Sequence, residues 1–121
     1  MEKLKLGIVG TGGICNNKHL PSLAKVADKV EVVALCDLIE EKAIATAKRH
    51  GLTDAKIYTD YKEMLADESI DIIHVCTPNV AHCQITVDAF EAGKHVLCEK
   101  PMAATSADAQ KMIDAWKKSG K

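Results

Sequence analysis

The feature that most constrains this chain is an apolar run that breaks into glycines, KLGIVGTGGIC at residues 5–15. We interpret it as a β-strand, a tight turn and the start of a helix. Gly10 permits the turn, and Gly12 has no Cβ to keep the backbone away from a pyrophosphate lying over the free N–H groups of the helix. Cys15 occupies the third small position of the Gly-x-Gly-x-x-Gly pattern and is larger than the usual glycine or alanine. The residues predicted to surround the pyrophosphate are Gly10, Thr11, Gly12, Gly13 and Ile14.

A glycine pattern alone is a weak indication of a dinucleotide site, so the rest of the chain has to support it. The 121 residues predict one domain with a substantial core, and 47% hydrophobic and 27% charged residues are typical of a globular protein. A formal charge of −1 argues against nucleic-acid binding. No apolar run approaches a membrane span, and the run at residues 6–9 is too short for a secretory signal.

The cysteines predict a reducing compartment. They are odd in number and contain no Cys-x-x-Cys pair, which disfavours a disulfide framework or a zinc site: Cys15, Cys36, Cys76, Cys83 and Cys98. Three of them fall at or near the ends of apolar runs, where a buried thiol acts as a small hydrophobic side chain. We therefore expect a cytoplasmic protein with no bound metal.

Strand-like and helix-like segments alternate along the whole chain. The strands are predicted at residues 3–9, 30–37, 56–59, 70–76 and 95–98. The helices are predicted at residues 14–28, with an irregular start because of Pro21, then at 39–50, at 60–68, between Asn79 and Gly93, and after Thr105. This alternation predicts an α/β fold, a Rossmann-like doubly wound parallel sheet with helices on both faces and strand order 3-2-1-4-5.

Helical spacing also predicts which side chains face the core. In the fourth helix the inner stripe is expected to be Val80, Cys83, Val87 and Phe90. In the fifth it is expected to be Ala109, Met112, Ile113 and Trp116. His74, inside a strand, is interpreted as a core histidine rather than a ligand.

Four loops follow the carboxyl ends of the strands, where open parallel sheets bind ligands: residues 10–14, 37–38, 77–79 and 99–100. Asp37 lies 27 residues after Gly10, where a carboxylate can accept hydrogen bonds from the adenosine ribose. A 2′-phosphate there would face Asp37, Glu40 and Glu41 with only Lys42 to offset them, so NAD(H) is favoured over NADP(H). The alternative is that Asp37 only caps the next helix.

Several of these segments together resemble the N-terminal domain of the glucose-fructose oxidoreductase / inositol dehydrogenase (Gfo/Idh/MocA) family. The resemblance covers essentially the whole chain and rests on Gly-Thr-Gly-Gly-Ile at 10–14, His-Leu-Pro at 19–21, Cys-Thr-Pro-Asn at 76–79 with His82, and Ala-Gly-Lys-His-Val-Leu-Cys-Glu-Lys-Pro at 92–101. It implies a two-domain NAD(P)-dependent oxidoreductase that acts mostly on sugars, polyols and related secondary alcohols.

The resemblance also implies roles for individual residues. Lys100 of Glu99-Lys100-Pro101 would lie beside the nicotinamide and the substrate hydroxyl, polarise that oxygen and help relay its proton. The alternative for Lys100 is a solvated surface lysine. The residues expected to line the path of the ribose and nicotinamide are Thr77, Pro78 and Asn79, with His82 shaping the pocket or serving as a packing residue.

Family members continue into a C-terminal domain that supplies the substrate pocket, the usual oligomer interface and further catalytic residues. We therefore expect residues 1–121 to be a cofactor-binding domain that is nearly inactive alone, because orientation of the substrate contributes much of such catalysis. The alternatives are a dinucleotide-sensing regulatory protein of the same fold, against which the intact Lys100 argues, and a complete stand-alone domain. The coding sequence beyond Lys121 would discriminate between them.

The expected sheet stops before a sixth strand, which has a physical consequence. The fifth strand, residues 95–98, becomes an edge with unpaired backbone groups and apolar side chains. Such an edge is a recognised place for pairing with another chain, so self-association through it is expected.

Overall fold

Five parallel strands form the centre of the molecule in the computed structural model, which describes residues 2–121. They are β1 (Leu4–Val9), β2 (Val30–Cys36), β3 (Lys56–Tyr58), β4 (Ile72–Val75) and β5 (His95–Cys98). Their order is β3-β2-β1-β4-β5, and every neighbouring pair is parallel. The predicted doubly wound sheet and its strand order are therefore confirmed. The order reverses direction between β1 and β4, so the chain leaves these two strands toward opposite faces of the sheet. Open parallel sheets bind ligands in the crevice outside the carboxyl ends of the strands at such a switch point.

Helical segments connect the strands. They are η1 (Cys15–His19), α1 (Leu20–Ala24), α2 (Glu40–Arg49), α3 (Tyr61–Leu65), η2 (Asn79–Ala81), α4 (His82–Glu91) and α5 (Ser106–Ser119). The irregular start predicted for the first helix is present as a π-helical turn, in which the N–H of Leu20 donates to the carbonyl of Cys15. Pro21 follows directly and has no N–H to donate, which fits a change of hydrogen-bond pattern at this point. This helix ends at Ala24, four residues earlier than expected.

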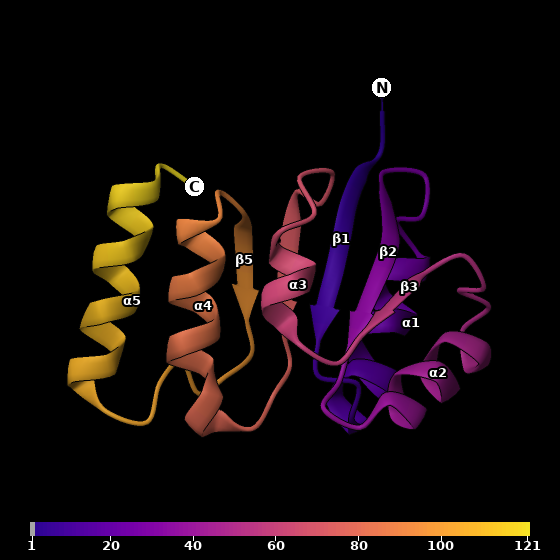
Figure 1. Cartoon of the computed structure of the whole chain (residues 1–121), viewed down its shortest axis with the longest axis horizontal. Helices are drawn as coiled ribbons and strands as arrows, with labels where there is room; N and C mark the ends of the chain where they lie inside the picture. The colour runs from indigo at the N-terminus through magenta and orange to yellow at the C-terminus, as the bar shows by residue number, and fades with distance from the viewer. Residues whose placement is uncertain (1) are drawn as a thin grey trace.

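The helices cover both faces of the sheet (Figure 1). On one face, side chains of η1, α1 and α2 pack against β1 and β2 in a cluster of Leu6, Ile8, Cys15, Leu20, Leu35, Ala43, Ala47 and Cys76. On the other, α3 and α4 pack on a cluster of Val9, Ala34, Cys36, Met64, Leu65, Ile70, Ile73, Val75, Ile85 and Ala89. Both faces of the central strands are buried, as expected for a parallel sheet with crossover helices.

The predicted inner stripes of α4 and α5 are partly wrong because α5 packs on the side of α4 rather than on the sheet (Figure 1). The side chains of α4 in the sheet core are Ile85 and Ala89. Val80, which was predicted in the inner stripe, is 84% exposed. On α5, Met112 is buried as predicted, but Trp116 is 48% exposed. A helix that contacts only one neighbouring helix buries a narrow stripe, and periodicity does not show how wide that stripe will be.

The glycine turn sits directly against the loop that follows β4. Gly10 has a φ of +98°, and a Cβ at this position would lie 2.7 Å from the carbonyl carbon and oxygen of Cys76. At Gly12, by contrast, a Cβ would have no described atom within 4 Å. Gly10 is therefore needed by the fold, and Gly12 leaves open space above the turn.

These two glycines make a matched pair for a stability measurement. We expect Gly10→Ala to lower the free energy of unfolding by about 2 kcal/mol or more, because the new methyl group meets the backbone of Cys76 at a positive φ. Gly12→Ala should leave it nearly unchanged. Urea denaturation of both variants measures the difference, and an equal loss in the two would contradict this account of the turn.

Candidate functional site

The loops at the carboxyl ends of the strands are fixed to one another by hydrogen bonds that continue the sheet. The N–H of Gly10 donates to the carbonyl of Cys36 at 2.8 Å, and the N–H of Cys76 donates to the carbonyl of Val9 at 2.8 Å. The N–H of Glu99 donates to the carbonyl of Val75 at 3.0 Å. The loops after β1, β2, β4 and β5 therefore begin from one rigid edge, which brings together the four loops predicted from the sequence.

Asp37 is tied to the glycine turn. Its Oδ2 accepts hydrogen bonds from the N–H of Thr11 at 3.0 Å and from the Thr11 hydroxyl at 2.8 Å, and its Oδ1 accepts from the N–H of Ile39 at 2.9 Å. Burial tends to raise the pKa of Asp37, but these hydrogen bonds outweigh it and hold the pKa below its ordinary value. The carboxylate is thus ionised at neutral pH and available as an acceptor.

The alternative role of Asp37 as a helix cap is wrong. The residue at the N-cap of α2 is Ile39, which makes no side-chain capping bond, and Asp37 lies two residues before it. Asp37 instead stabilises the turn before α2, because its Oδ1 accepts a hydrogen bond from the N–H of Ile39. A carboxylate has about four acceptor positions, and three of them are used here, so one remains for an outside donor such as a ribose hydroxyl.

The glycine turn is held from below by Asn16, which sequence reasoning missed. The Asn16 side-chain amide donates to the carbonyls of Thr11 at 2.9 Å and Gly12 at 3.0 Å, and its oxygen contacts His50 Nε2 at 3.1 Å. The signal that could have identified it is an asparagine directly after the glycine turn, where its amide can reach the carbonyls of the turn. Because these bonds pull carbonyls inward, the N–H side of the turn remains available to an anion.

Cys15 fits into the close contact between this helix and the sheet. Its side chain is completely buried, and burial, aided by the negative charge of Asp37, raises the pKa of its thiol to about 12. It is therefore a neutral packing group at physiological pH. Cys15 is larger than the glycine or alanine that usually occupies this position, and the structure buries its side chain completely.

Glu99 is anchored by His19 of η1, which in turn contacts His74 of β4. Its Oε2 lies 2.7 Å from Nε2 of His19, and Nδ1 of His19 lies 3.0 Å from Nδ1 of His74. The hydrogen bond from His19, together with one from the N–H of Lys100, lowers the pKa of Glu99. Burial lowers the pKa of His74 to about 4, with a further contribution from His19, so His74 is neutral. The sequence predicted His74 in the core, but not this contact.

Lys100 lies at the exposed rim of the same edge. Its N–H donates to Oε1 of Glu99 at 3.1 Å, whereas its ammonium forms no ion pair with any residue in the described part of the chain. In the loop after β4, Pro78 and Asn79 are exposed and Thr77 is half-buried. The side chain of Lys100 is thus free to reach a ligand while its backbone is held.

His82 is buried beneath these loops rather than facing the crevice. None of its surface is exposed, and its ring nitrogens lie 2.8 Å from the carbonyl oxygens of Pro101 and Thr77. The sequence placed His82 near the cofactor, and that assignment stays a prediction. Any effect it has on a ligand would pass through the loops to which it is bonded.

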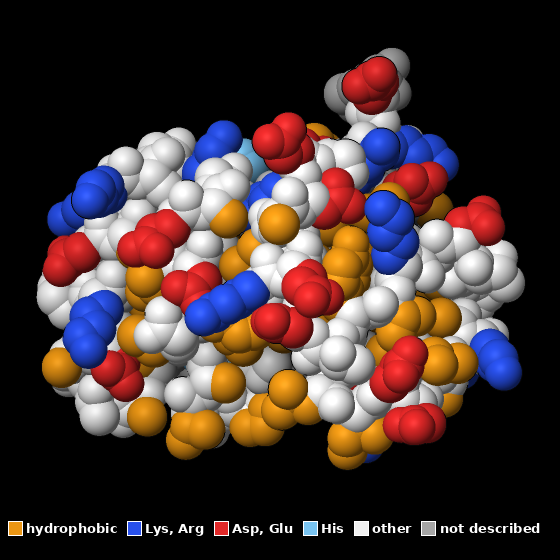
Figure 2. Space-filling model, viewed as in Figure 1, with side chains coloured by type: hydrophobic (Ala, Val, Ile, Leu, Met, Phe, Trp, Pro, Cys, Tyr) orange, Lys and Arg blue, Asp and Glu red, His pale blue; other side chains and the backbone are white. Residues whose placement is uncertain are grey.

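Exposed apolar side chains lie at the end of the sheet where these loops are found, and apart from Ile14 sequence reasoning did not assign them to the site. Figure 2 shows hydrophobic side chains gathered along the lower margin, the end toward which the strands of Figure 1 point. The exposed apolar residues at this end include Ile14, Leu38, Ile39 and Met102, of which Leu38 is 91% exposed. Their position directly after strands is the signal that could have identified them, since apolar walls with a few polar groups are typical of cofactor sites.

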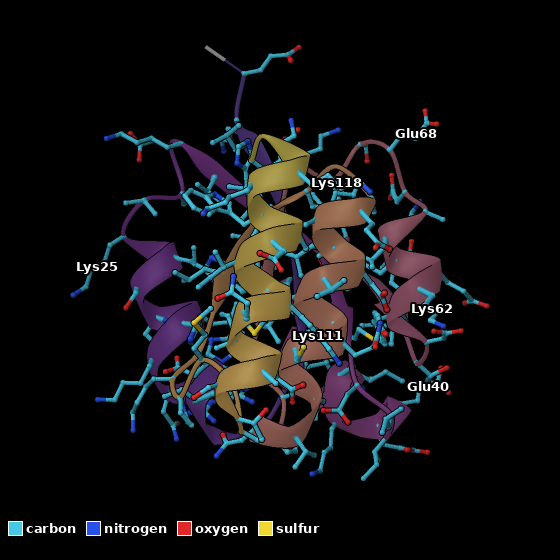
Figure 3. All side chains as sticks on the ribbon, turned by 90° about the vertical axis from the view of Figure 1, so that its left-hand side faces the viewer. Lys25, Glu40, Lys62, Glu68, Lys111 and Lys118 are labelled. Carbon is cyan, nitrogen blue, oxygen red and sulfur yellow. The ribbon has the colours of Figure 1, made fainter. Side chains whose placement is uncertain are left out.

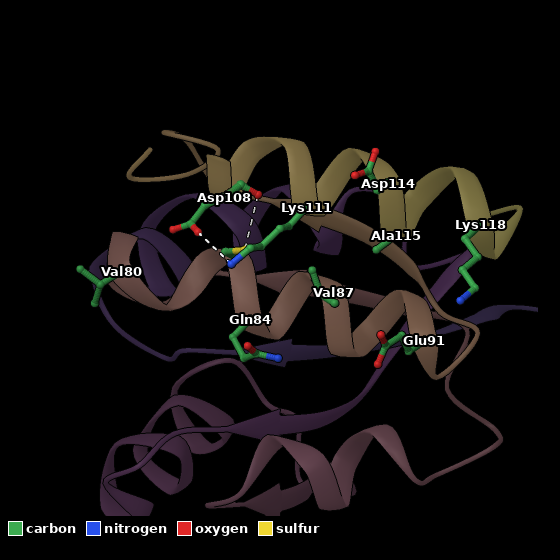
Figure 4. A pocket seen from close by; sticks show the side chains of 10 residues that line it. Val80, Gln84, Val87, Glu91, Asp108, Lys111, Asp114, Ala115 and Lys118 are labelled. Carbon is green, nitrogen blue, oxygen red and sulfur yellow. Dashed lines mark hydrogen bonds and ion pairs between the residues drawn. The ribbon is translucent and has the colours of Figure 1, made fainter. Parts of the chain in front are cut away.

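A separate groove of about 520 Å³ runs between α4 and α5 on the outer side of the molecule (Figure 4). Figure 3, which faces this side, shows the two helices side by side with Lys111 and Lys118 labelled. In the groove Lys111 lies 3.9 Å from Asp108, and the walls mix Val87 with Glu91. Charged side chains of both signs line it together with Val87 and Ala115, and it lies away from the loops that follow the strands.

Two classes of site find no support within residues 2–121. No group of His, Cys, Asp and Glu side chains there is arranged to hold a metal ion. No helix there is long and apolar enough to cross a membrane.

Several of these residues have the chemistry to hold a dinucleotide. The turn leaves open space at Gly12 with N–H groups that have no intrahelical acceptor, which suits a pyrophosphate. Asp37 retains acceptor capacity after the neighbouring strand β2, which suits a ribose, and Lys100 follows β5 at the same edge of the sheet. These are the residues that could hold such a cofactor.

Comparison with known proteins agrees with this geometry. A family model described as "Oxidoreductase family, NAD-binding Rossmann fold" matches residues 4–121. Inositol 2-dehydrogenase of Salmonella paratyphi B is 42% identical over 118 residues, which cover 98% of this chain and 34% of the relative. The chain thus spans about a third of the length of such relatives.

Solved structures show the same similarity. The WlbA dehydrogenase from Bordetella pertussis, in complex with NADH and UDP-GlcNAcA, superposes with a TM-score of 0.90 and 32% identity, covering 98% of this chain and 35% of that one. KijD10, a 3-ketoreductase from Actinomadura kijaniata in complex with TDP-benzene and NADP, has in its open conformation a TM-score of 0.88 and 26% identity, covering 98% of this chain and 36% of that one.

The bond between Thr11 and Asp37 predicts a pH-dependent effect on stability. We expect Thr11→Val to lower the free energy of unfolding by about 1 kcal/mol above about pH 5, because it removes a hydroxyl donor from a carboxylate. The folded pKa of Asp37 is lowered, so this stabilisation is present above the unfolded value near about 3.9 and is lost as the pH falls through the folded value. Urea denaturation across the acid range measures it, with Thr59→Val at an exposed threonine as the control. A loss that is the same at every pH would show that the hydroxyl does not act through Asp37.

Proposed function

Because this chain belongs to the Gfo/Idh/MocA oxidoreductase family with its NAD-binding Rossmann fold, we propose that it is the cofactor domain of an NAD(P)-dependent dehydrogenase. The proposed reaction transfers hydride between the nicotinamide and a secondary alcohol or ketone of a sugar, polyol or related compound. The observation that carries this proposal is the convergence of the glycine turn, Asp37 and the loop bearing Lys100 on one crevice. The similarity to inositol 2-dehydrogenase supports the substrate class.

In this proposal each loop contacts a different part of the dinucleotide. The N–H groups at Gly12, Gly13 and Ile14 bind the pyrophosphate, and Asp37 accepts from the adenosine ribose. The loop of Thr77, Pro78 and Asn79 follows the second ribose toward the nicotinamide, and Glu99 leads into Lys100 at the far side of the crevice. Exposed Leu38 offers an apolar surface beside Asp37 for the adenine.

Lys100 is the proposed catalytic residue. Its ammonium is exposed at the rim, and a cation there stabilises negative charge that develops on the substrate oxygen and exchanges a proton with it. The bound nicotinamide supplies or accepts the hydride. Glu99 holds the backbone of Lys100 and does not contact the substrate in this scheme.

The charge around Asp37 favours NAD(H) over NADP(H). Asp37 is ionised, and Glu40 and Glu41 open the helix that follows it, with Lys42 as the nearby cation. A 2′-phosphate would have to lie against these carboxylates. Among the solved structures, the WlbA dehydrogenase holds NADH and KijD10 holds NADP, so the preference rests on this chain's own residues.

We propose that residues 1–121 alone do not turn over substrate. They span about a third of the relatives' length, and the pocket that orients the substrate is proposed to lie in a further domain. All five cysteines are free thiols in the described chain, which supports function in the reducing cytoplasm.

Calorimetric titration with NADH and with NADPH tests the site directly. We expect the 121-residue chain to bind NADH several-fold more tightly than NADPH, and to show no turnover with a panel of sugars and polyols. Asp37→Ala should weaken NADH binding about tenfold and remove the preference, because one charged hydrogen-bond acceptor is lost. Gly12→Ala, whose methyl group occupies only open space in the fold, should weaken both dinucleotides.

Absence of binding by the unmodified chain would overturn the proposed site. Turnover by the chain alone would overturn only the proposal that a further domain is needed. An Asp37→Ala variant that keeps its preference for NADH would show that the carboxylate does not select the cofactor.

We also propose that the chain self-associates through β5. This strand pairs with β4 on one side, no strand among residues 2–121 pairs with its other side, and Leu97 on it is 51% exposed. Sedimentation velocity should show a concentration-dependent increase in mass that Leu97→Lys abolishes. Leu38→Lys, at an exposed leucine in the loop after β2, is the control. A monomer at high concentration would contradict the proposal.

A further inference from the structure

His82 occupies an unusual position at the start of α4. Its ring is completely buried, with Nδ1 2.8 Å from the carbonyl oxygen of Pro101 and Nε2 2.8 Å from that of Thr77. Pro101 follows β5, and Thr77 follows β4. Figure 1 shows α4 beginning at the same lower end of the molecule where these two loops run. A single imidazole therefore joins the two loops on the nicotinamide side of the proposed site.

The chemistry of this contact restricts the protonation state of the ring. A carbonyl oxygen can only accept a hydrogen bond, so each ring nitrogen has to donate. A neutral imidazole has one N–H, and its other nitrogen would direct a lone pair at a carbonyl oxygen 2.8 Å away. Both hydrogen bonds exist together only in the imidazolium form. With no exposed surface on His82, water cannot replace the bond that the neutral form lacks.

The loop after β5 is also held from its other side. Glu99 receives a hydrogen bond from Nε2 of His19 at 2.7 Å and accepts one from the N–H of Lys100 at 3.1 Å. Lys100 therefore lies between two anchored neighbours, Glu99 and Pro101. Its backbone is fixed at both ends, whereas its side chain is exposed.

We propose that His82, as an imidazolium, is a positioning residue that ties the Lys100 loop to the Thr77 loop and thereby controls how firmly the nicotinamide end of the dinucleotide is held. This inference rests on the proposed function for its consequence, and on the contacts of His82 alone for its charge state. It predicts tighter engagement of the nicotinamide end at acidic than at alkaline pH, because loss of one ring proton leaves one loop unbonded.

The other ionisable groups on the segments around His82 do not provide this pH dependence. Burial raises the thiol pKa values of Cys76 and Cys98 at the strand ends, and of Cys83 on α4, so these remain neutral. Hydrogen bonds from His19 and Lys100 lower the pKa of Glu99. None of the charged side chains on these segments hydrogen-bonds to the His82 ring in the described structure. They include Lys100 on the loop, Asp88 and Glu91 on α4, and Asp108 and Lys111 on α5.

Ring NMR of the nitrogen-15-labelled chain tests the charge state without any cofactor. We expect two slowly exchanging ring N–H signals from His82 at neutral pH, assigned by their loss in His82→Gln. Exposed His95, at the opposite end of β5 from the Lys100 loop, is the internal control. A neutral His82, with a single protonated nitrogen throughout the range from about pH 6 to about pH 8, would overturn the proposal whether or not the chain binds NADH.

Binding measurements test the positioning role. ADP-ribose lacks the nicotinamide, so the ratio of its dissociation constant to that of NADH isolates the nicotinamide end. We expect this ratio to fall about tenfold between about pH 6 and about pH 9, as one charged hydrogen bond is lost. His82→Gln, which keeps an amide donor but no titrating proton, should lower the ratio and remove its pH dependence.

Matched variants separate this role from others. His95→Gln should keep the dependence of the unmodified chain, and His19→Gln should keep it too, because the glutamine amide can still donate to Glu99. If His82→Gln fails to fold, the ring NMR of the unmodified chain still decides the charge state. A ratio that is independent of pH in the unmodified chain would overturn the positioning role, whereas failure of both NADH and ADP-ribose to bind would instead overturn the proposed function.

Discussion

The close contact between the end of β1 and the loop after β4 is the constraint on which the site depends. Gly10 can occupy this place because it has no side chain and a positive φ, and a methyl group there would meet the backbone of Cys76. The hydrogen bond from Cys76 to Val9 holds the two strand ends together at that point. Every loop that faces the crevice is positioned relative to this junction, so the geometry of the binding site follows from the packing of the sheet.

Hydrogen bonds between loops and neighbouring elements hold the site in place. Asp37 fastens the loop after β2 to the glycine turn through Thr11, and His19 fastens the loop after β5 to the first helix through Glu99. In both cases a carboxylate accepts several donors, which keeps it ionised and leaves little freedom to the backbone around it. The groups that remain free are those that a ligand could use, namely the N–H groups of the turn and the ammonium of Lys100.

Features that depend on local sequence pattern were predicted correctly, whereas features that depend on contacts between distant residues were not. The strands at residues 30–37 and 95–98 could be placed within a residue because their apolar runs are bounded by turn residues, and the strand order follows from crossover rules that hold for any such sheet. Trp116 was misplaced because helical periodicity identifies an apolar face but not the element that covers it. Asn16 was missed because its role depends on carbonyls that become neighbours only when the turn has formed.

The sequence by itself determined the fold class, the glycine turn and the membership of an oxidoreductase family, since these depend on local spacing and on residue types in fixed motifs. Only the tertiary structure decided that Asp37 bonds to Thr11 instead of capping a helix, and that His82 lies beneath the loops with both ring nitrogens against carbonyl oxygens. The physical reason is that a hydrogen bond depends on the position and direction of two groups. For residues 26 apart, such as Thr11 and Asp37, both are set by how the strands and helices pack.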